Sequence, residues 1–309
     1  MLGADVSPAQ YASLLQRGTQ GDARWLQFDL DTLRSHYNRQ PFLLEHRLQE
    51  HPLFDIAPLF NLAQRLPAQQ VKFRRGDIAP DADFDATFKP PPDALTLPHL
   101  LAHFEPLHGY ICINNPEKDA QYRPEIEALL AEIAAHIHPL DPQITWYSTY
   151  VFISAQGAVT PYHMDREMNF LLQIRGEKTA DLWDQDDPVI LRPAQKDRLL
   201  AYEGARPPYK PEFEARAQHF ALRPGLGVHH PFIAPHRVWT QSNLSISLAF
   251  TFRTRRSDRL TAAHQFNARL RRIGLQNPKP VGESAWLDST KAQALHALQR
   301  LRHPLHAAR

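Results

Sequence analysis

Apolar residues in the first half of the chain recur mainly at helical spacing. Residues 122–137 carry apolar side chains three and four positions apart until Pro139 ends the run, and residues 53–66 are apolar in a similar way. Both segments predict helices. Shorter apolar runs predict strands at 42–47, before both helices, and at 70–73 and 110–113, between them. The Pro- and Asp-rich stretch 79–98 has no such pattern, and it predicts a surface loop.

The second half has a different pattern, in which β-branched and aromatic residues are punctuated by Gly and Pro. It predicts strands at 145–155, 168–175, 178–183, 218–222 and 244–252. In the last of these, large apolar residues alternate with Ser, Ala and Thr, so one face packs and the other is small and polar. Because no helices separate these strands, their order favours an antiparallel barrel or double-sheet jelly roll over a parallel α/β sheet.

Helical spacing returns after Arg256. Ser257 can cap a helix that ends near Gly274, and a second helix is expected to begin at Asp288 or Ser289. The second helix repeats leucine along one face, at Leu295, Leu298, Leu301 and Leu305. Such a face needs burial, either against the same chain or in a homodimer, and the sequence leaves both open.

Composition narrows the class of protein. The 309 residues are 43% hydrophobic and 22% charged, as in an ordinary globular protein, and 27 prolines against 12 glycines suit extended segments joined by stiff loops. Cys112 is the single cysteine, which excludes an internal disulfide and a Cys-rich zinc site. Any metal site must therefore use carboxylate oxygen and histidine, of which there are 17.

Charge and hydropathy argue against several partners. A formal net charge of +2 makes general nucleic-acid binding unexpected, and the arginine-rich stretch 253–272 is interpreted as a solvated helix face. No run approaches the roughly 18 apolar residues of a membrane span, and the first residues lack the apolar core of a signal peptide. We therefore expect a soluble, cytoplasmic protein without a membrane partner.

The sharpest local motif lies between residues 159 and 178. Side chains two apart in a strand point to the same side, so His163 and Asp165 can present an imidazole and a carboxylate to one metal ion. The pair could also be an ordinary hydrogen-bonded pair, because chance alone supplies roughly one His-x-Asp in such a chain. His236 is the candidate third ligand, since a jelly roll returns a strand about 70 residues later to the side of the first.

Two histidines and one carboxylate on one face of a metal leave coordination positions open, which non-haem Fe(II) oxygenases require. Zinc in a hydrolytic site is the competing interpretation. A zinc hydrolase usually also needs a nearby general base, and no His-Glu-x-x-His motif or equivalent occurs in the chain.

The same residues resemble a known family. The segment AVTPYHMDREMNFLLQIRGEK, with APH and the SISLAF strand later, resembles the JmjC/cupin-like Fe(II)- and 2-oxoglutarate-dependent oxygenases, and within them the asparaginyl hydroxylase type that acts on hypoxia-inducible factor. The resemblance covers residues 100–255 with decreasing clarity toward both ends. It implies a mainly β fold with a double-stranded β-helix (jelly-roll) core and flanking helices. A catalytic domain with an N-terminal α/β elaboration is expected over 1–255, and a C-terminal helical segment over 256–309.

The resemblance also implies an activity. His163, Asp165 and His236 fall on the iron ligands that form the catalytic centre. The implied reaction uses Fe(II), O2 and 2-oxoglutarate, and it couples decarboxylation of 2-oxoglutarate to succinate with oxidation of a second substrate. That substrate is a protein, a peptide or a small molecule, and the outcome is hydroxylation or demethylation through hydroxylation.

Four further residues match positions that hold 2-oxoglutarate in the family. Thr160 and Lys178 fall on the hydroxyl and the ammonium that bind its distal carboxylate. Asn169 matches an amide that helps to hold the cosubstrate, and Tyr110 matches a tyrosine that reaches the same carboxylate. The chemistry is reasonable in itself, because a buried carboxylate needs a cation and hydroxyl donors.

Two departures from the family bear on the substrate. Ala249 stands where the asparaginyl hydroxylase type has an asparagine, and His229 and His230 replace a Trp-rich approach to the distal histidine. Asparagine hydroxylation is therefore not transferred to this chain, and His229 and His230 stay open as substrate contacts. We expect the rim of the site at 79–98 and 203–217, because loops usually carry specificity.

Two other classes of function remain possible at this stage. One is a non-catalytic metal-binding cupin that senses or binds a small acidic ligand, and the other is a cupin isomerase or hydrolase with Zn or Mn. Lys178 and Thr160 discriminate between these and an oxygenase. A site for a metal alone has no need of a buried ammonium and a hydroxyl beyond the open coordination face.

Overall fold

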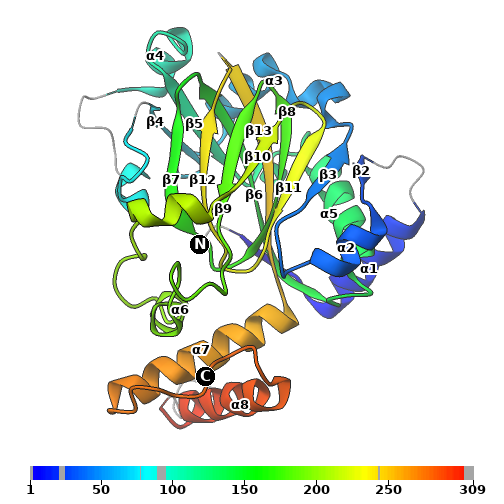
Figure 1. Cartoon of the computed structure of the whole chain (residues 1–309). Helices are drawn as coiled ribbons and strands as arrows, with labels where there is room; N and C mark the ends of the chain where they lie inside the picture. The colour runs from blue at the N-terminus through cyan, green and yellow to red at the C-terminus, as the bar shows by residue number, and fades with distance from the viewer. Residues whose placement is uncertain (1–2, 21–24, 77, 89–94, 243, 303–309) are drawn as a thin grey trace.

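The centre of the molecule is a barrel made of two antiparallel sheets (Figure 1). The computed structural model describes residues 3–20, 25–76, 78–88, 95–242 and 244–302. The larger sheet runs in the order β2 (Leu26–Gln27), β3 (Leu43–His46), β11 (Leu226–His230), β8 (Met168–Arg175), β13 (Leu244–Thr254), β6 (Ile144–Ala155), β5 (Gly109–Asn114) and β4 (Val71–Arg75), and β1 (Ala4–Asp5) pairs with β6. The smaller sheet runs in the order β10 (Gln218–Leu222), β9 (Lys178–Leu182), β12 (Pro235–Thr240) and β7 (Val159–Met164).

The strands from β6 to β13 form a jelly roll. In chain order the larger sheet takes β6, β8, β11 and β13, and the smaller sheet takes β7, β9, β10 and β12. The first and last of these strands, β6 and β13, pair along their whole length, from Leu244 opposite Ala155 to Thr254 opposite Ile144. This arrangement confirms the double-stranded β-helix core that the sequence predicted.

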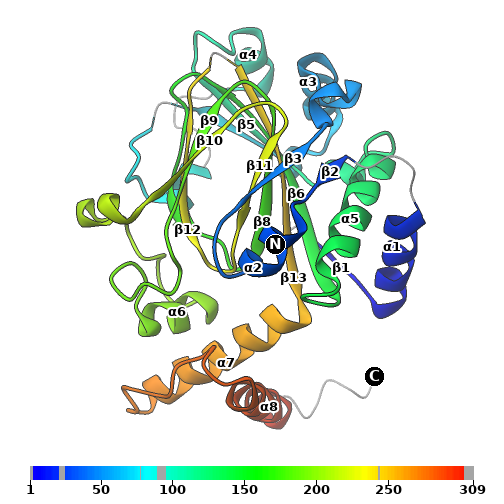
Figure 2. The same ribbon diagram turned by 45° about the vertical axis from the view of Figure 1, so that its right-hand side comes forward.

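Helices cover the outside of the barrel. Figures 1 and 2 show α1 and α5 beside the larger sheet, and α7 and α8 as a pair beyond one end of the barrel. The α-helices are α1 (Pro8–Gln20), α2 (Leu30–His36), α3 (Ile56–Arg65), α4 (Leu97–Ala102), α5 (Arg123–Ile137), α6 (Pro193–Leu200), α7 (Arg255–Arg272) and α8 (Ala285–Arg302). None of these described helices has the length and the apolar composition needed to cross a membrane.

The two faces of β13 explain how the barrel is packed. Leu248 and Phe250 lie on its outer face in the main hydrophobic core, which also contains apolar side chains of α5 such as Leu129. The opposite face carries Ala249, which packs in a smaller apolar cluster between the sheets, and Thr251, which lines a cavity. The predicted alternation along 244–252 is therefore confirmed, and its small, polar face points into the barrel.

Three of the predictions made from the sequence need correction. The predicted helix 53–66 is a 3-10 turn, Pro52–Phe54, followed by α3, because the side chain of Asp55 accepts a hydrogen bond from the Ile56 amide and starts a new helix. Strands β11 and β12 were not among the predicted strands, since the segment GVHHPFIAPHRVW shows no regular alternation. The stretch 79–98 contains a 3-10 helix, η4 (Phe84–Phe88), that packs onto the site described below.

The C-terminal helices begin earlier than predicted. Thr254, not Ser257, caps α7, and the two side chains form a reciprocal capping box. Helix α8 begins at Ala285 instead of Asp288 or Ser289. Leu295 is buried against α7, whereas Leu298 and Leu301 are exposed and Leu305 lies outside the described residues. Packing within the chain thus accounts for part of the leucine face. Neither the homodimer nor the division of the chain at residue 255 is tested by the structure, so both stay predictions.

Candidate metal centre and cosubstrate cavity

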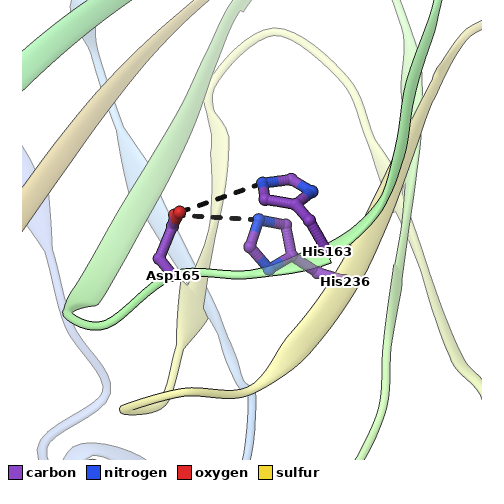
Figure 3. A group of neighbouring side chains, drawn as sticks. All are labelled: His163, Asp165 and His236. Carbon is purple, nitrogen blue, oxygen red and sulfur yellow. Dashed lines mark ion pairs between the residues drawn. The ribbon is translucent and has the colours of Figure 1, made fainter. Parts of the chain in front are cut away.

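The three candidate metal ligands meet on the smaller sheet. His163 on β7 and His236 on β12 are cross-strand partners, and Asp165 follows directly after the end of β7. Their ligand atoms lie within 4.8 Å of one another. The Nε2 atom of each histidine lies 3.9 Å from an Asp165 carboxylate oxygen. Dashed lines mark these two pairs in Figure 3. The fold therefore brings together residues that are 73 positions apart in the sequence, as 236 minus 163 shows.

Each histidine is held by a hydrogen bond at its other ring nitrogen. Nδ1 of His163 lies 2.7 Å from the carbonyl oxygen of Pro161, and Nδ1 of His236 lies 3.0 Å from that of Ala234. A carbonyl oxygen can only accept, so each Nδ1 carries the proton and donates it. The lone pair of each Nε2 then faces the Asp165 carboxylate, and this is the tautomer that binds a metal through Nε2.

Burial keeps both imidazoles neutral. The side chains of His163 and His236 are both buried. Burial lowers the pKa of His163 well below its usual value, and the nearby His236 lowers it further. Burial also lowers the pKa of His236, although Asp165 opposes the shift. Neutral imidazoles need not lose a proton before they bind a metal, so this donor set fits a divalent cation.

The candidate ligands line a cavity of about 480 Å³. Cavities of this size are typical of small-molecule sites. Both sheets contribute to its wall, and apolar side chains lie next to a few polar ones. The apolar part includes Phe152, Leu171, Val238 and Ala249. The polar part includes all seven residues that the sequence assigned to metal or cosubstrate: Tyr110, Thr160, His163, Asp165, Asn169, Lys178 and His236.

Lys178 supplies a buried cation to this cavity. It begins β9, is 4% exposed, and its Nζ donates to Ser247 Oγ at 2.8 Å. Ser247 Oγ in turn donates to Gln173 Oε1 at 2.8 Å. Burial lowers the pKa of Lys178 to about 7, and no carboxylate among the described residues offsets this shift. A buried ammonium whose described hydrogen-bond partner is a hydroxyl, not a carboxylate, favours an anionic ligand.

Two hydroxyl groups extend the polar wall. The hydroxyl oxygens of Tyr110 and Thr160 are 3.2 Å apart, and the guanidinium of Arg74 lies 4.0 Å from the centroid of the Tyr110 ring. Thr160 on β7 and Lys178 on β9 both flank β12, which runs between their strands. Burial raises the pKa of Tyr110 to about 12, so its hydroxyl keeps its proton and can donate to a carboxylate.

Two neighbouring side chains, one on β8 and one just before it, have buried oxygens without a described partner. Asn169 Oδ1 is one, and Glu167 Oε1 is the other. Both residues line the cavity. Burial, assisted by the neighbouring Asp165, raises the pKa of Glu167 to about 7. Asn169 was predicted from the family pattern, whereas Glu167 was missed because a glutamate next to a strand gives no signal of its own.

The structure separates the two adjacent histidines on β11. His230 lines the cavity, and its ring centroid lies 4.4 Å from that of His236. His229 points to the other side of the strand, where its ring stacks on Tyr37. Its two nitrogens are both bonded, Nε2 accepting from the Asn38 amide and Nδ1 donating to the Asn169 carbonyl. Only His230 is therefore placed to contact a substrate, because neighbours in a strand face opposite ways.

Both expected rim segments reach the cavity. Phe84 and Asp85 come from the stretch 79–98, and Arg206 comes from 203–217. The ring of Phe84 is stacked on the imidazole of His163, with the centroids 3.7 Å apart and the planes 4° from parallel. Sequence reasoning placed the rim in these loops but could not identify these side chains, because loop residues carry no periodic signal.

Fold and site together define a class: a double-stranded β-helix protein with a candidate metal centre of two histidines and one carboxylate. Among solved structures, the chain is similar to YcfD, a ribosomal oxygenase from Escherichia coli. One YcfD structure has 15% identity and a TM-score of 0.46, covering 92% of this chain and 70% of that one. A YcfD complex with cobalt and 2-oxoglutarate has 16% identity and a TM-score of 0.39, covering 90% and 69%.

A cupin superfamily protein from Desulfitobacterium hafniense has 13% identity and a TM-score of 0.23, covering 34% of this chain and 66% of that one. No family model matches the sequence, and no curated protein matches it either. This likeness does not single out the asparaginyl hydroxylase type. At these identities and TM-scores the likeness concerns the fold alone.

Proposed function

We propose that this protein is an Fe(II)- and 2-oxoglutarate-dependent oxygenase. The observation that carries the proposal is the pairing of two features in one cavity: the ligand set of His163, Asp165 and His236, and the buried ammonium of Lys178. A metal site alone does not account for a buried cation that has no carboxylate partner in the described part of the chain. A dicarboxylate that binds the metal at one end and the ammonium at the other accounts for both.

The metal and cosubstrate would supply the oxidising chemistry: O2 is consumed, 2-oxoglutarate is decarboxylated to succinate, and one oxygen atom enters a C–H bond of the second substrate. His163 and His236 would hold Fe(II) through Nε2 and Asp165 through a carboxylate oxygen, leaving other coordination positions for ligands. The carbonyls of Pro161 and Ala234 keep both imidazoles in the required tautomer.

The remaining polar residues of the cavity would bind 2-oxoglutarate. The ammonium of Lys178 pairs with the distal carboxylate, and the hydroxyls of Thr160 and Tyr110 donate to it. Asn169 offers an amide whose oxygen has no described partner. Leu171 and Val238 contribute apolar wall that limits water around the reacting groups.

The second substrate is a protein, a peptide or a small molecule, and hydroxylation and demethylation are both compatible with this site. It would reach the metal past the rim, where Arg206, Tyr202 and Asp85 line the cavity, and His230 lies next to His236. The location that fits this chemistry is the cytoplasm, where 2-oxoglutarate and Fe(II) are at hand.

The direct test measures succinate by proton NMR after incubation with Fe(II), 2-oxoglutarate and O2. Slow decarboxylation is expected even without the second substrate, and His163→Ala should abolish it. His103→Ala is the matched control, because this histidine is exposed and lies outside the cavity. Succinate at the same level in the wild type and His163→Ala would contradict the proposal. Tight binding of Zn²⁺ or Mn²⁺ with no succinate under any condition would favour a metal-binding cupin or a hydrolytic enzyme.

A further inference from the structure

Two loops of the rim meet at the metal ligands. The first contains η4, whose Phe84 ring lies parallel to the His163 imidazole with centroids 3.7 Å apart. The second contains Arg206, whose guanidinium carbon lies 5.2 Å from the centroid of the same Phe84 ring. Arg206 also forms an ion pair with Asp85, the residue after Phe84. A single arginine therefore joins the two loops beside one metal ligand.

Arg206 also contacts the strand that carries the ligands. Its Nε donates to the carbonyl oxygen of Met164 at 3.1 Å. Met164 lies between His163 and Asp165, and its carbonyl belongs to the same peptide plane as the Asp165 amide. Holding this carbonyl therefore limits how the Asp165 backbone can rotate.

Asp165 needs such a restraint more than the histidines do. The pairing of β7 with β12 ends at Met164 opposite Pro235, so Asp165 lies beyond the ladder that holds His163 and His236. Each histidine has a hydrogen bond from Nδ1 to a carbonyl oxygen. The Asp165 side chain is 29% exposed, and its described contacts are the two long ion pairs with these histidines.

We propose that Arg206 is a positioning residue of the metal centre. It fixes the peptide that leads into Asp165, and through Phe84 and Asp85 it holds an aromatic ring against the face of His163. Divalent-metal affinity and coordination geometry would then depend on the closure of these two rim loops. This inference rests on the proposed metal site but not on the identity of the cosubstrate or substrate.

The test compares metal binding by the full chain, without any turnover. Mn²⁺ affinity is measured from the EPR signal of the free ion, and the geometry of the site from the visible spectrum of bound Co²⁺. Arg206→Met should weaken Mn²⁺ binding by roughly 10-fold or more, as loss of groups that orient metal ligands usually does, and should change the Co²⁺ spectrum. If Arg206 merely closed the rim, its replacement would change neither the Mn²⁺ affinity nor the Co²⁺ spectrum.

Arg216→Met is the matched control, because Arg216 belongs to the same rim segment but pairs with Asp187 on the surface and does not line the cavity. It should bind both metals like the wild type. If Arg206→Met fails to fold by circular dichroism, Arg206→Lys is used instead, since one ammonium cannot reproduce the forked contacts to Met164 and Asp85.

The outcomes separate this inference from the proposed function. Wild-type Mn²⁺ affinity and an unchanged Co²⁺ spectrum in a folded Arg206 variant would overturn the positioning role and leave the metal site intact. Failure of the wild type to bind either metal would contradict the proposed function itself, and the positioning role with it.

Discussion

Single residues carry most of the chemistry proposed here, and Lys178 carries the most. Its ammonium is buried beside Ser247, and burial lowers its pKa to about 7. A protein rarely keeps such a group without a partner, because desolvation of an unpaired charge is costly. The incoming carboxylate of a ligand would relieve that cost, which is why this lysine distinguishes a cosubstrate site from a plain metal site.

Replacing Lys178 should therefore weaken 2-oxoglutarate binding and leave metal binding intact. For Lys178→Met we expect the KM for 2-oxoglutarate to rise roughly 10- to 100-fold, the usual worth of a charge-assisted hydrogen bond. Mn²⁺ affinity without cosubstrate should not change. Lys72→Met is the control, because Lys72 also lines the cavity but is exposed. An unchanged KM in Lys178→Met would remove this residue from the cosubstrate site.

The lowered pKa of Lys178 also predicts a pH dependence. Below pH 7 the lysine is protonated before the ligand arrives, so the anion binds at full strength. Above pH 7 the free protein is increasingly neutral there, and binding must first take up a proton, which costs about tenfold in affinity per pH unit. Calorimetric Kd values for 2-oxoglutarate should thus rise between pH 7 and 9. In Lys178→Arg, which stays protonated, the slope should vanish; the same slope in that variant would assign it to another group.

The residue pattern predicted the metal ligands but not every side chain around them. The pair His163 and Asp165 followed from the two-residue period of a strand, and His236 from the return of a jelly-roll strand. The bonds that fix the imidazole tautomers could not be predicted, because each joins a ring to a carbonyl oxygen two residues back, and residue spacing does not fix how a ring is oriented. Glu167 and Phe84 were also out of reach, because their positions depend on how loops pack.

At the scale of elements, the jelly roll explains why distant segments form one site. Strand β12 pairs with β7 on one side and with β9 on the other, so it places His236 next to His163. The two flanking strands carry Thr160 and Lys178, which line the same cavity. The alternation along 244–252 made the last strand, β13, predictable. Strands β11 and β12 were less so, because their short segments around Pro231 are buried on both faces and show no alternation.

The junction between β13 and α7 allows a test of element stability. Thr254 caps α7 and its hydroxyl also donates to the buried Asp141 carboxylate at 2.9 Å. Thr254→Ala should lower the free energy of unfolding by about 1–2 kcal/mol, measured by urea denaturation. Thr254→Ser, which retains the hydroxyl, should stay close to the wild type. Equal losses in both variants would point to the lost methyl group instead of the cap.

In the whole molecule, the two faces of the larger sheet serve different purposes: one contributes to stability and the other to the site. The outer face of the larger sheet packs on the N-terminal helices and contains the main hydrophobic core, while the inner face looks onto the cavity. The C-terminal helices are tied to the barrel where Asp197 of α6 meets His264 and Arg271 of α7. A mainly β class with flanking helices could be predicted from the pattern alone. The closure of the two rim loops over the metal ligands could not, because it depends on contacts far apart in the sequence.

The proposed function requires that one cavity binds Fe(II) and 2-oxoglutarate together. An anaerobic titration of the Fe(II)-loaded protein with 2-oxoglutarate tests it most directly, because chelation of Fe(II) by this cosubstrate produces a weak visible metal-to-ligand charge-transfer band. We expect a saturable band in the wild type, its loss in Asp165→Ala, and saturation at higher 2-oxoglutarate concentration in Lys178→Met. Fe(II) that binds but gives no band at any 2-oxoglutarate concentration would show that the cavity does not bind the two together.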